Sequence, residues 1–352
     1  MELTHGGDWA GFEREYGRKA LDFSANISPF GLLEGVQSAV IEALAEAGRY
    51  PDPLCRELRT ALAGRYSVQE ARIVCGNGSA DLIWRLCRAL RPKRAAVFAP
   101  GFAEYTLALR AEDCAVTEIP LHASDDFRMT EDSIARIPSR CELVFLCNPN
   151  NPTGLLTERE LLLALLRRCR ENGTVLALDE CFLDFCEGAE RHSLIGALAE
   201  YPELVILRAF TKTHAMAGLR LGYALCGDER LAEKLQACGQ PWAVSGIAQA
   251  AGIVALRETE YVNETRGLIA AERRRMFAAL SALGLRVIPG EANFLLFCCG
   301  DKALAEKLRK RAILIRDCSG FSGLSKGWYR TAIRTAAEND ALLTALSEVL
   351  HG

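Results

Sequence analysis

The sequence predicts an α/β fold in which a mainly parallel central sheet is flanked by helices and accompanied by a smaller α+β domain. Short apolar runs that end in turn residues alternate with stretches of helical spacing, a pattern typical of βαβ units. The chain has 352 residues, which is long for one hydrophobic core and sufficient for two domains. We therefore expect an N-terminal segment over 1–45 that packs with the small domain, a large domain over 46–240 and the small domain over 241–352.

The elements can be assigned in order along the chain. A short strand over 72–75 precedes a helix over 82–90, and a second helix of the same spacing covers 157–172. The other buried strands predicted for the large sheet are 95–99, 143–147, 175–178, 204–207 and 221–225. The elements expected after them are a long helix from Ser245 to Leu283 and strands near 287, 293–297 and 313–316.

The composition limits the class of partner. A net charge of −3 and a pI near 6.1 provide no general attraction for nucleic acid or an anionic membrane, so anions must be bound by particular arginines. No run reaches the roughly 18 apolar residues of a membrane span. The first residues lack the basic and apolar regions of a signal peptide, and we expect a cytoplasmic protein. The 14 cysteines are dispersed without a CxxC pair, so we interpret them as small apolar residues rather than disulfides or metal ligands.

Four polar residues occur in an order that suits pyridoxal phosphate (PLP). Lys212 can bond to its aldehyde, Asp179 can pair with the pyridine nitrogen and Asn151 can donate to the ring oxygen. Arg220 can pair with the phosphate. Because the first three each follow a strand-like run, parallel strands would deliver them to one edge of the sheet. Taken singly, Asp179 could equally cap a helix, Asn151 mark a loop and Arg220 lie solvated on the surface.

Neighbouring residues complete a candidate phosphate site. Gly78 and Ser79 open a helix directly after a strand, where free backbone N–H groups bind phosphate. The glycines alone are weak evidence, because the third glycine of a dinucleotide fingerprint is missing. Thr211 offers a hydroxyl either to the same phosphate or to local backbone. Either Phe102 or Tyr105 could stack on the pyridine ring, and both could also be core aromatics.

The ordered motifs resemble the fold-type I PLP enzymes, the aspartate-aminotransferase superfamily, over essentially the whole chain. The motifs are Gly-Asn-Gly at 76–78, Asn-Pro-Thr-Gly at 151–154, Asp-Glu at 179–180, Thr-Lys at 211–212 and Gly-Leu-Arg-Leu-Gly-Tyr at 218–223. Two families within the superfamily compete: the histidinol-phosphate aminotransferases and the L-threonine-O-3-phosphate decarboxylases of cobalamin synthesis. The decarboxylases resemble this chain more closely, above all in His-Gly-Gly at 5–7 and Ala-Glu-Asn at 337–339. Phe182 favours them too, because transaminating relatives usually carry a tyrosine near the ring oxygen.

The resemblance implies roles for residues that contact a phosphorylated amino-acid substrate. Arg334 would pair with the α-carboxylate, and the planar guanidinium suits that task. Arg316 and His5 would hold the substrate phosphate. Ser28 and Asn151 would make further substrate contacts. On the alternative interpretation, Arg316 merely ends a strand and His5 lies in a disordered terminus.

The resemblance also implies a homodimer with shared sites. Tyr50 looks like the tyrosine that reaches the PLP phosphate of the neighbouring subunit; otherwise it is an ordinary packed tyrosine. Two residues depart from the family pattern. Ala209 replaces the hydroxyl residue often found three positions before the lysine, so one phosphate hydrogen bond is expected to be missing. Ser28 stands where the decarboxylases tend to have asparagine, so contacts on the substrate side are expected to differ.

The resemblance favours a PLP-dependent carboxy-lyase that converts L-threonine O-3-phosphate to (R)-1-amino-2-propanol O-2-phosphate, the linker of the corrin nucleotide loop. The Cα bond that stands perpendicular to the cofactor ring breaks, and the motifs do not show which bond that is. The alternative is a histidinol-phosphate aminotransferase that transfers the amino group to 2-oxoglutarate. A third possibility, a catalytically silent PLP-fold binding protein, is disfavoured by the joint presence of Lys212, Asp179, Asn151 and Arg220. L-serine phosphate differs from the favoured substrate by one methyl group, so the preference between them stays open.

Overall fold

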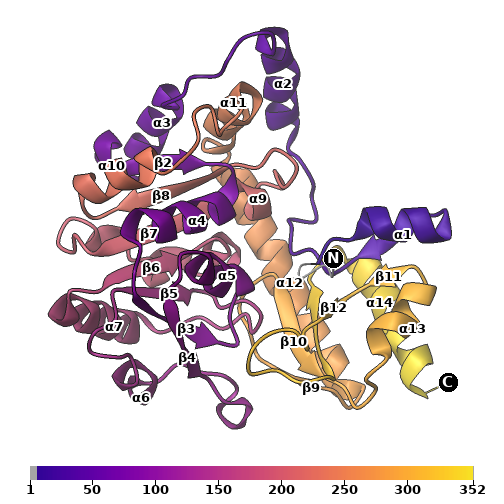
Figure 1. Ribbon diagram of the computed structural model, residues 1–352. Coiled ribbons are helices and arrows are strands. Elements are labelled where there is room, and N and C mark those ends of the chain that lie inside the picture. Colours follow the sequence, from indigo (N-terminus) through magenta and orange to yellow (C-terminus); the bar gives the residue numbers. More distant parts are fainter. Residues whose placement is uncertain (1–5, 352) are drawn as a thin grey trace.

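The computed structural model describes residues 6–351 and contains a large sheet, a smaller sheet and a separate pair of strands (Figure 1). Of the described strands in the large sheet, only β8 runs antiparallel to its neighbours. From one edge to the other the strands are β2 (Ile73–Gly76), β8 (Gly222–Cys226), β7 (Leu204–Ala209), β6 (Val175–Asp179), β5 (Leu143–Cys147), β3 (Arg94–Ala99) and β4 (Ala115–Pro120). The predicted mainly parallel sheet flanked by helices is confirmed.

The central strands form because their residues are apolar on both faces, as a sheet covered on both sides requires. β5, β6 and β7 pair in parallel register, with Cys147 opposite Asp179 and Asp179 opposite Leu207. All three strands therefore end at the same edge of the sheet. From that edge the chain continues to Asn151 after β5 and to Lys212 after β7.

Helices cover the two faces of the large sheet. On one face α4, α5 and α10 pack side chains such as Leu86 and Leu235 against the strands. On the other face α3, α7 and α11 contribute residues such as Leu62 and Leu165. The helix bounds are α1 (Trp9–Tyr16), α2 (Glu34–Ala43), α3 (Arg56–Tyr66), α4 (Gly78–Leu90), α5 (Ala103–Ala111), α6 (Glu131–Ala135), α7 (Arg159–Asn172), α8 (Ala189–His192), α9 (Phe210–Thr213), α10 (Glu229–Ala237), α11 (Gly246–Ala255), α12 (Thr259–Ala282), α13 (Leu304–Lys310) and α14 (Ala336–His351).

α7 shows how the sequence determines such a helix. Its buried side chains Leu162, Leu165, Leu166 and Cys169 recur at three- and four-residue spacing, so one stripe of the helix faces the sheet. Gly173 ends it with a left-handed φ of 65°, a conformation that favours glycine. No helix in the described range 6–351 is long and apolar enough to cross a bilayer.

The C-terminal part holds a four-stranded antiparallel sheet with its own apolar core, which α12, α13 and α14 help to form. Its strands in spatial order are β12 (Arg316–Asp317), β13 (Trp328–Ala332), β10 (Phe294–Cys298) and β9 (Arg286–Val287). Near the start of the chain, β1 (Leu21–Asp22) pairs in parallel with β11 (Ile313–Leu314), so this N-terminal segment lies beside the C-terminal part (Figure 1).

Two predicted elements are divided in the structure. The expected helix from Ser245 to Leu283 is two helices, because the backbone N–H groups of Arg257 and Glu258 bond three residues back and end α11. α11 then packs against α2 and α3, whereas α12 leads into the C-terminal part (Figure 1). The expected strand over 313–316 is β11 and β12, which separate because each pairs with a different partner strand. The domain limits themselves stay a prediction.

Candidate active site

Two adjoining cavities are bordered by residues that follow the carboxyl ends of β5, β6 and β7. The larger has a volume of about 690 Å³ and the smaller about 120 Å³. Asp179 lies in the wall of the smaller cavity. The residues that border both cavities are Ala80, Phe102, Asn151, Phe182, Lys212 and Arg220. The structure thus brings Asn151, Asp179 and Lys212 together at the sheet edge where ligands of parallel sheets bind.

Lys212 lies in α9, immediately after β7, with its Nζ atom 5.6 Å from the centre of the Phe182 ring. Burial, followed by the positive charge of Arg330, lowers the pKa of Lys212 from 10.5 to about 8. A substantial fraction of this amine is therefore neutral near physiological pH. Only the neutral amine is a nucleophile, so the environment prepares Lys212 to bond to an aldehyde.

Asp179 closes β6 and is buried. Its Oδ2 accepts a hydrogen bond of 2.7 Å from the Tyr105 hydroxyl, and its Oδ1 accepts one of 3.0 Å from the backbone N–H of Cys181. Burial and the adjacent carboxylate raise the pKa of Tyr105 well above its usual value, so its hydroxyl stays a donor. The Tyr105 ring stacks on Phe145 with centres 4.7 Å apart. Tyr105 therefore supports Asp179. Of the two aromatic residues expected to stack on the ring, Phe102 is the one that borders both cavities, and the stacking itself stays a prediction.

Two cysteines, Cys147 and Cys181, also border the smaller cavity. Burial is the main cause that raises the pKa of both thiols, and the neighbouring charge of Asp179 raises them further. Both thiols therefore stay protonated at physiological pH, and a protonated thiol is a poor nucleophile. Neither cysteine supplies an alternative to Lys212 as the residue that forms a covalent bond.

The start of α4 forms the phosphate end of the smaller cavity. Ser79 and Thr211 lie in its wall, and Arg220 closes it from the opposite side of the turn. Gly78 has a φ of 79°, and a Cβ added there would lie 2.6 Å from Nη2 of Arg220. Glycine is therefore needed at this position for both its backbone conformation and the close approach of the guanidinium. A cation beside free N–H groups at a helix start suits a phosphate.

Arg330 on β13 is a cavity residue that the sequence reasoning missed. It is 6% exposed, yet it borders the larger cavity. Its Nη1 donates to Oδ1 of Asn151, and its Nη2 donates to the carbonyl of Ser24 at 3.0 Å. With its amide oxygen turned inward, Asn26 accepts from the same guanidinium at 3.3 Å. The available signal was a single charged residue inside an otherwise strand-like run, because an enclosed charge usually has a specific partner.

Arg334 is not among the described residues that border either cavity. It lies beyond the end of β13, where its Nε and Nη2 donate to Glu338 at 2.9 and 2.6 Å. Its Nη1 donates to the carbonyl of Asp22 at 3.3 Å. The guanidinium is thus engaged outside the cavity. The structure therefore does not place Arg334 at the cavity as expected, and Arg330 is the arginine of β13 that reaches both Asn151 and the cavity.

Of the other residues predicted to contact the substrate, some border the larger cavity and some do not. Arg316 lies in the wall of the larger cavity, as expected. Ser28 borders neither cavity among the described residues, because its hydroxyl accepts a hydrogen bond of 2.9 Å from Tyr261. Its backbone N–H donates to the carbonyl of Lys212 at 3.0 Å, so Ser28 holds the lysine turn in place instead of facing a substrate. His5 lies outside the described residues.

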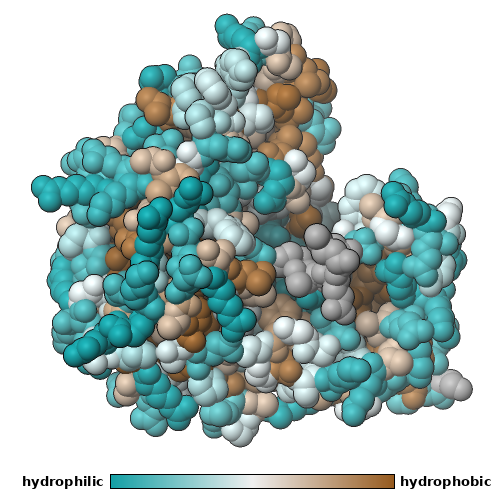
Figure 2. All heavy atoms as spheres, in the orientation of Figure 1, coloured by the Kyte–Doolittle hydropathy of each residue, from teal (hydrophilic) through white to brown (hydrophobic). Residues whose placement is uncertain are grey.

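Tyr50 belongs to the outer surface and borders neither cavity among the described residues. It is 77% exposed, and its ring stacks on Trp242 with centres 4.4 Å apart. Ile41 and Leu44 are exposed on the adjoining α2 segment. Figure 2 shows hydrophobic side chains gathered over α2 and α11. A contact between Tyr50 and a site must therefore involve a second chain, which stays a prediction.

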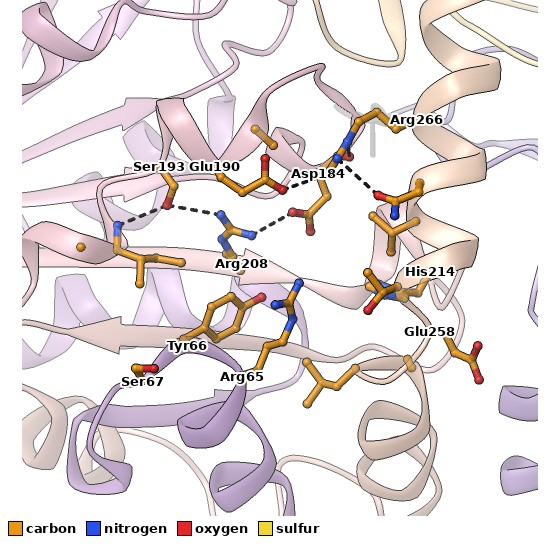
Figure 3. A pocket seen from close by; sticks show the side chains of 18 residues that line it. Arg65, Tyr66, Ser67, Asp184, Glu190, Ser193, Arg208, His214, Glu258 and Arg266 are labelled. Carbon is orange, nitrogen blue, oxygen red and sulfur yellow. Dashed lines mark hydrogen bonds and ion pairs between the residues drawn. The ribbon is translucent and has the colours of Figure 1, made fainter.

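A third cavity of about 310 Å³ is bordered by Arg208 of β7 (Figure 3). The Arg208 guanidinium donates to Oε2 of Glu180 at 2.7 Å and to Oδ1 of Asp184 at 2.9 Å. Glu180 directly follows Asp179 in the sequence, and it also accepts from the Ser193 hydroxyl at 2.8 Å. This buried network ties β7 to the end of β6 immediately before the chain reaches the candidate site.

The arrangement fits PLP, because a reactive amine, a buried carboxylate, an aromatic wall and a phosphate cup all face one cavity. Residues 18–346 match the family model for class I and II aminotransferases. The chain belongs to that family. Enzymes of the family use pyridoxal 5'-phosphate, so the cofactor prediction is confirmed. The predicted fold-type I architecture is confirmed by the same match.

Three known proteins show the extent of the similarity within the aminotransferase family. The chain is 40% identical over 335 residues to the threonine-phosphate decarboxylase of Salmonella typhimurium. The aligned residues cover 94% of this chain and 92% of that protein. It resembles the histidinol-phosphate aminotransferase of Sinorhizobium meliloti, solved in complex with pyridoxal-5'-phosphate, with a TM-score of 0.88, 27% identity and coverage of 99% and 95%. The L-threonine-O-3-phosphate decarboxylase of Porphyromonas gingivalis gives a TM-score of 0.82, 27% identity and coverage of 94% and 100%.

Proposed function

We propose that this enzyme decarboxylates L-threonine O-3-phosphate to (R)-1-amino-2-propanol O-2-phosphate and carbon dioxide, for the corrinoid nucleotide loop. The observation that carries the proposal is the pair of arginines, Arg316 and Arg330, in the cavity beside Lys212. They are additional to Arg220, which lies at the cofactor phosphate end. Two further guanidinium groups suit an amino acid that bears both a carboxylate and a phosphate. The 40% identity to a threonine-phosphate decarboxylase supports this substrate.

The chain's residues divide the work between cofactor and substrate. When bound, PLP accepts the electron pair that remains at Cα after a bond there breaks. Lys212 would hold the cofactor through its amine, and once released, its protonated side chain could deliver a proton to the substrate Cα. Tyr105 and the Cys181 N–H hold the Asp179 carboxylate in position, where it would pair with the pyridine nitrogen and keep it protonated. Asn151 accepts from Arg330 through its carbonyl oxygen, so its amide nitrogen would be the group that donates to the ring oxygen of the cofactor.

Phe182 favours decarboxylation over transamination. It borders both cavities beside Lys212, and its ring meets Phe294 edge-on with centres 5.1 Å apart. A phenyl ring supplies no hydrogen bond to the cofactor ring oxygen, so Asn151 is the donor assigned to that oxygen.

The second candidate is a histidinol-phosphate aminotransferase, which the likeness to the Sinorhizobium meliloti enzyme supports. That reaction requires 2-oxoglutarate as acceptor and releases no carbon dioxide.

The deciding experiment supplies L-threonine phosphate to the PLP-loaded enzyme without any keto acid. Carbon dioxide and aminopropanol phosphate are measured, and parallel incubations contain L-serine phosphate, or histidinol phosphate with 2-oxoglutarate. We expect rapid carbon dioxide release that is lost in Lys212→Ala and retained in Lys234→Ala, an exposed lysine of α10. Glutamate formation from histidinol phosphate, with no carbon dioxide from L-threonine phosphate, would replace the lyase with the aminotransferase.

A further inference from the structure

We infer that Asp81, Arg85 and Gly239 form a buttress that sets the backbone of the phosphate-binding turn, with Arg85 as a positioning residue for the cofactor phosphate. The turn covers 76–79, from the last residue of β2 to the first two residues of α4. The buttress lies behind the turn, so it would act on the phosphate through the backbone and not by contact. This inference depends on the bound cofactor and not on which substrate bond breaks.

Asp81 connects the first turn of α4 to the loop before it. Its Oδ2 accepts a hydrogen bond of 2.8 Å from the backbone N–H of Asn77. A Cβ added to Gly76 would lie 2.9 Å from the same oxygen, so the carboxylate rests directly against the turn. The path of the turn therefore depends on where this carboxylate is held. The N–H groups of Gly78 and Ser79 that follow are the ones available to a phosphate.

The Asp81 carboxylate brings a negative charge close to the place where the cofactor phosphate binds, and two anions repel each other. Arg85, one helical turn further on, offsets that charge. Its Nε donates to Oδ1 at 2.9 Å and its Nη2 donates to Oδ2 at 2.5 Å, so both carboxylate oxygens are engaged. Arg85 is only 4% exposed, which strengthens the interaction and fixes its geometry. Loss of Arg85 would leave the carboxylate unneutralised and free to turn.

Gly239 provides the space that Arg85 needs. A Cβ at this position would lie 2.2 Å from Nη1 and 2.3 Å from Cζ of Arg85, which is far inside van der Waals contact. Gly239 follows α10, and its backbone N–H donates to the carbonyl of Gln236 at 3.1 Å, so the backbone there is fixed. Gly239→Ala would therefore displace the guanidinium while leaving Asp81 and Arg85 chemically intact.

The experiment compares binding of PLP with binding of pyridoxal, which lacks the phosphate. Full-length wild type, Arg85→Met, Gly239→Ala and the double variant are dialysed against graded concentrations of each compound, and bound cofactor is measured by absorbance. We expect each single variant to weaken PLP binding at least about tenfold, since charged hydrogen bonds are lost. Pyridoxal binding should change by less than about twofold, because the buttress acts at the phosphate end.

Two controls separate positioning from general packing. Arg88→Met changes an exposed arginine of the same helix and should leave both affinities unchanged. The double variant should bind PLP no more weakly than the weaker single variant, because both changes act through one guanidinium. Equal losses for PLP and pyridoxal, additive losses in the double variant, or wild-type PLP affinity in Gly239→Ala would each overturn the inference. Melting temperatures show whether each variant is folded. If Arg85→Met does not fold, the PLP affinity of Gly239→Ala alone tests the inference.

Discussion

The pKa of Lys212 sets the pH range in which the enzyme takes up its cofactor, because only the neutral amine attacks an aldehyde. Burial and the charge of Arg330 lower this pKa to about 8, so the neutral fraction rises as the pH increases through about 8. The rate constant for PLP loading of cofactor-free protein should therefore rise about tenfold per pH unit below about pH 8 and level off above it. Stopped-flow absorbance across this pH range measures the profile.

The same pH profile tests the contribution of Arg330 to the lowered pKa of Lys212. Its positive charge disfavours the charged form of Lys212, so Arg330→Met should move the midpoint to higher pH. Arg334→Met is the matched control, because that guanidinium is already engaged by Glu338. A midpoint that stays in place in Arg330→Met, or moves to lower pH, would contradict the electrostatic account.

Substrate kinetics distinguish the same two arginines. Arg330→Met removes an enclosed cation from the cavity wall and should lower kcat/KM for L-threonine phosphate about 100-fold. Arg334→Met should lower it less than about fivefold, because this side chain lies outside the cavity. A larger loss in Arg334→Met than in Arg330→Met would restore the assignment first made from the sequence.

Among the structural elements, β6 and β7 depend on the buried pair of Glu180 and Arg208, whose side chains are 0% and 7% exposed. Glu180→Gln leaves part of the Arg208 charge uncompensated and should lower the free energy of unfolding by about 3 kcal/mol. The surface pair of Asp301 and Lys307 is the control. Asp301→Asn should change the free energy of unfolding by less than about 1 kcal/mol. Urea unfolding of the PLP-loaded proteins measures both, and equal effects would argue against a special contribution of the buried pair.

The elements also show how much of the fold could be predicted. Most strands of the large sheet were predictable because each is a short apolar run that ends in a turn, and the predicted 143–147 coincides with β5. The edge strand β4 was not predicted, because it is largely exposed and contains the polar residues Thr117 and Glu118. The shared edge for Asn151 and Lys212 followed from the parallel order. The break between α11 and α12 was not predictable, because three-residue hydrogen bonds at Arg257 and Glu258 end the helix without glycine or proline.

The substrate side of the site could be predicted only in part. Arg330 and Arg334 lie four residues apart, and sequence spacing does not show which of them faces the cavity. That choice depends on the pairing of Leu296 with Arg330 across β10 and β13, and on the end of β13 at Ala332. The register between β10 and β13 therefore determines which arginine faces the cavity. The support of Asp179 by a tyrosine likewise depends on tertiary packing, which places a side chain of α5 beside the end of β6.

For the whole molecule we propose a homodimer in which Tyr50 serves the partner's site. The exposed apolar surface over α2 and α11, with Tyr50 stacked on Trp242, is the face we assign to the second chain (Figure 2). A hybrid of one Tyr50→Ala chain and one Lys212→Ala chain contains one complete site. At limiting PLP it should therefore show about half of the wild-type activity, while both variant homodimers show little.

The contrary outcome is equally specific. If Tyr50 acts within its own chain, the hybrid has no complete site, and its activity per intact lysine stays at the level of the Tyr50→Ala homodimer. Sedimentation velocity on the wild type supplies the second measurement, and a monomer at assay concentration would remove the basis for a shared site.

The guanidinium of Arg330 joins the carbonyl of Ser24 to the side chain of Asn151. These residues come from three widely separated parts of the sequence. During translation, the ribosome therefore makes Asp179 and Lys212 well before it makes β13. The cavity wall beside Lys212 can therefore be completed only after β13 has been made, so a nascent chain contains Lys212 before it contains the arginine that lowers its pKa.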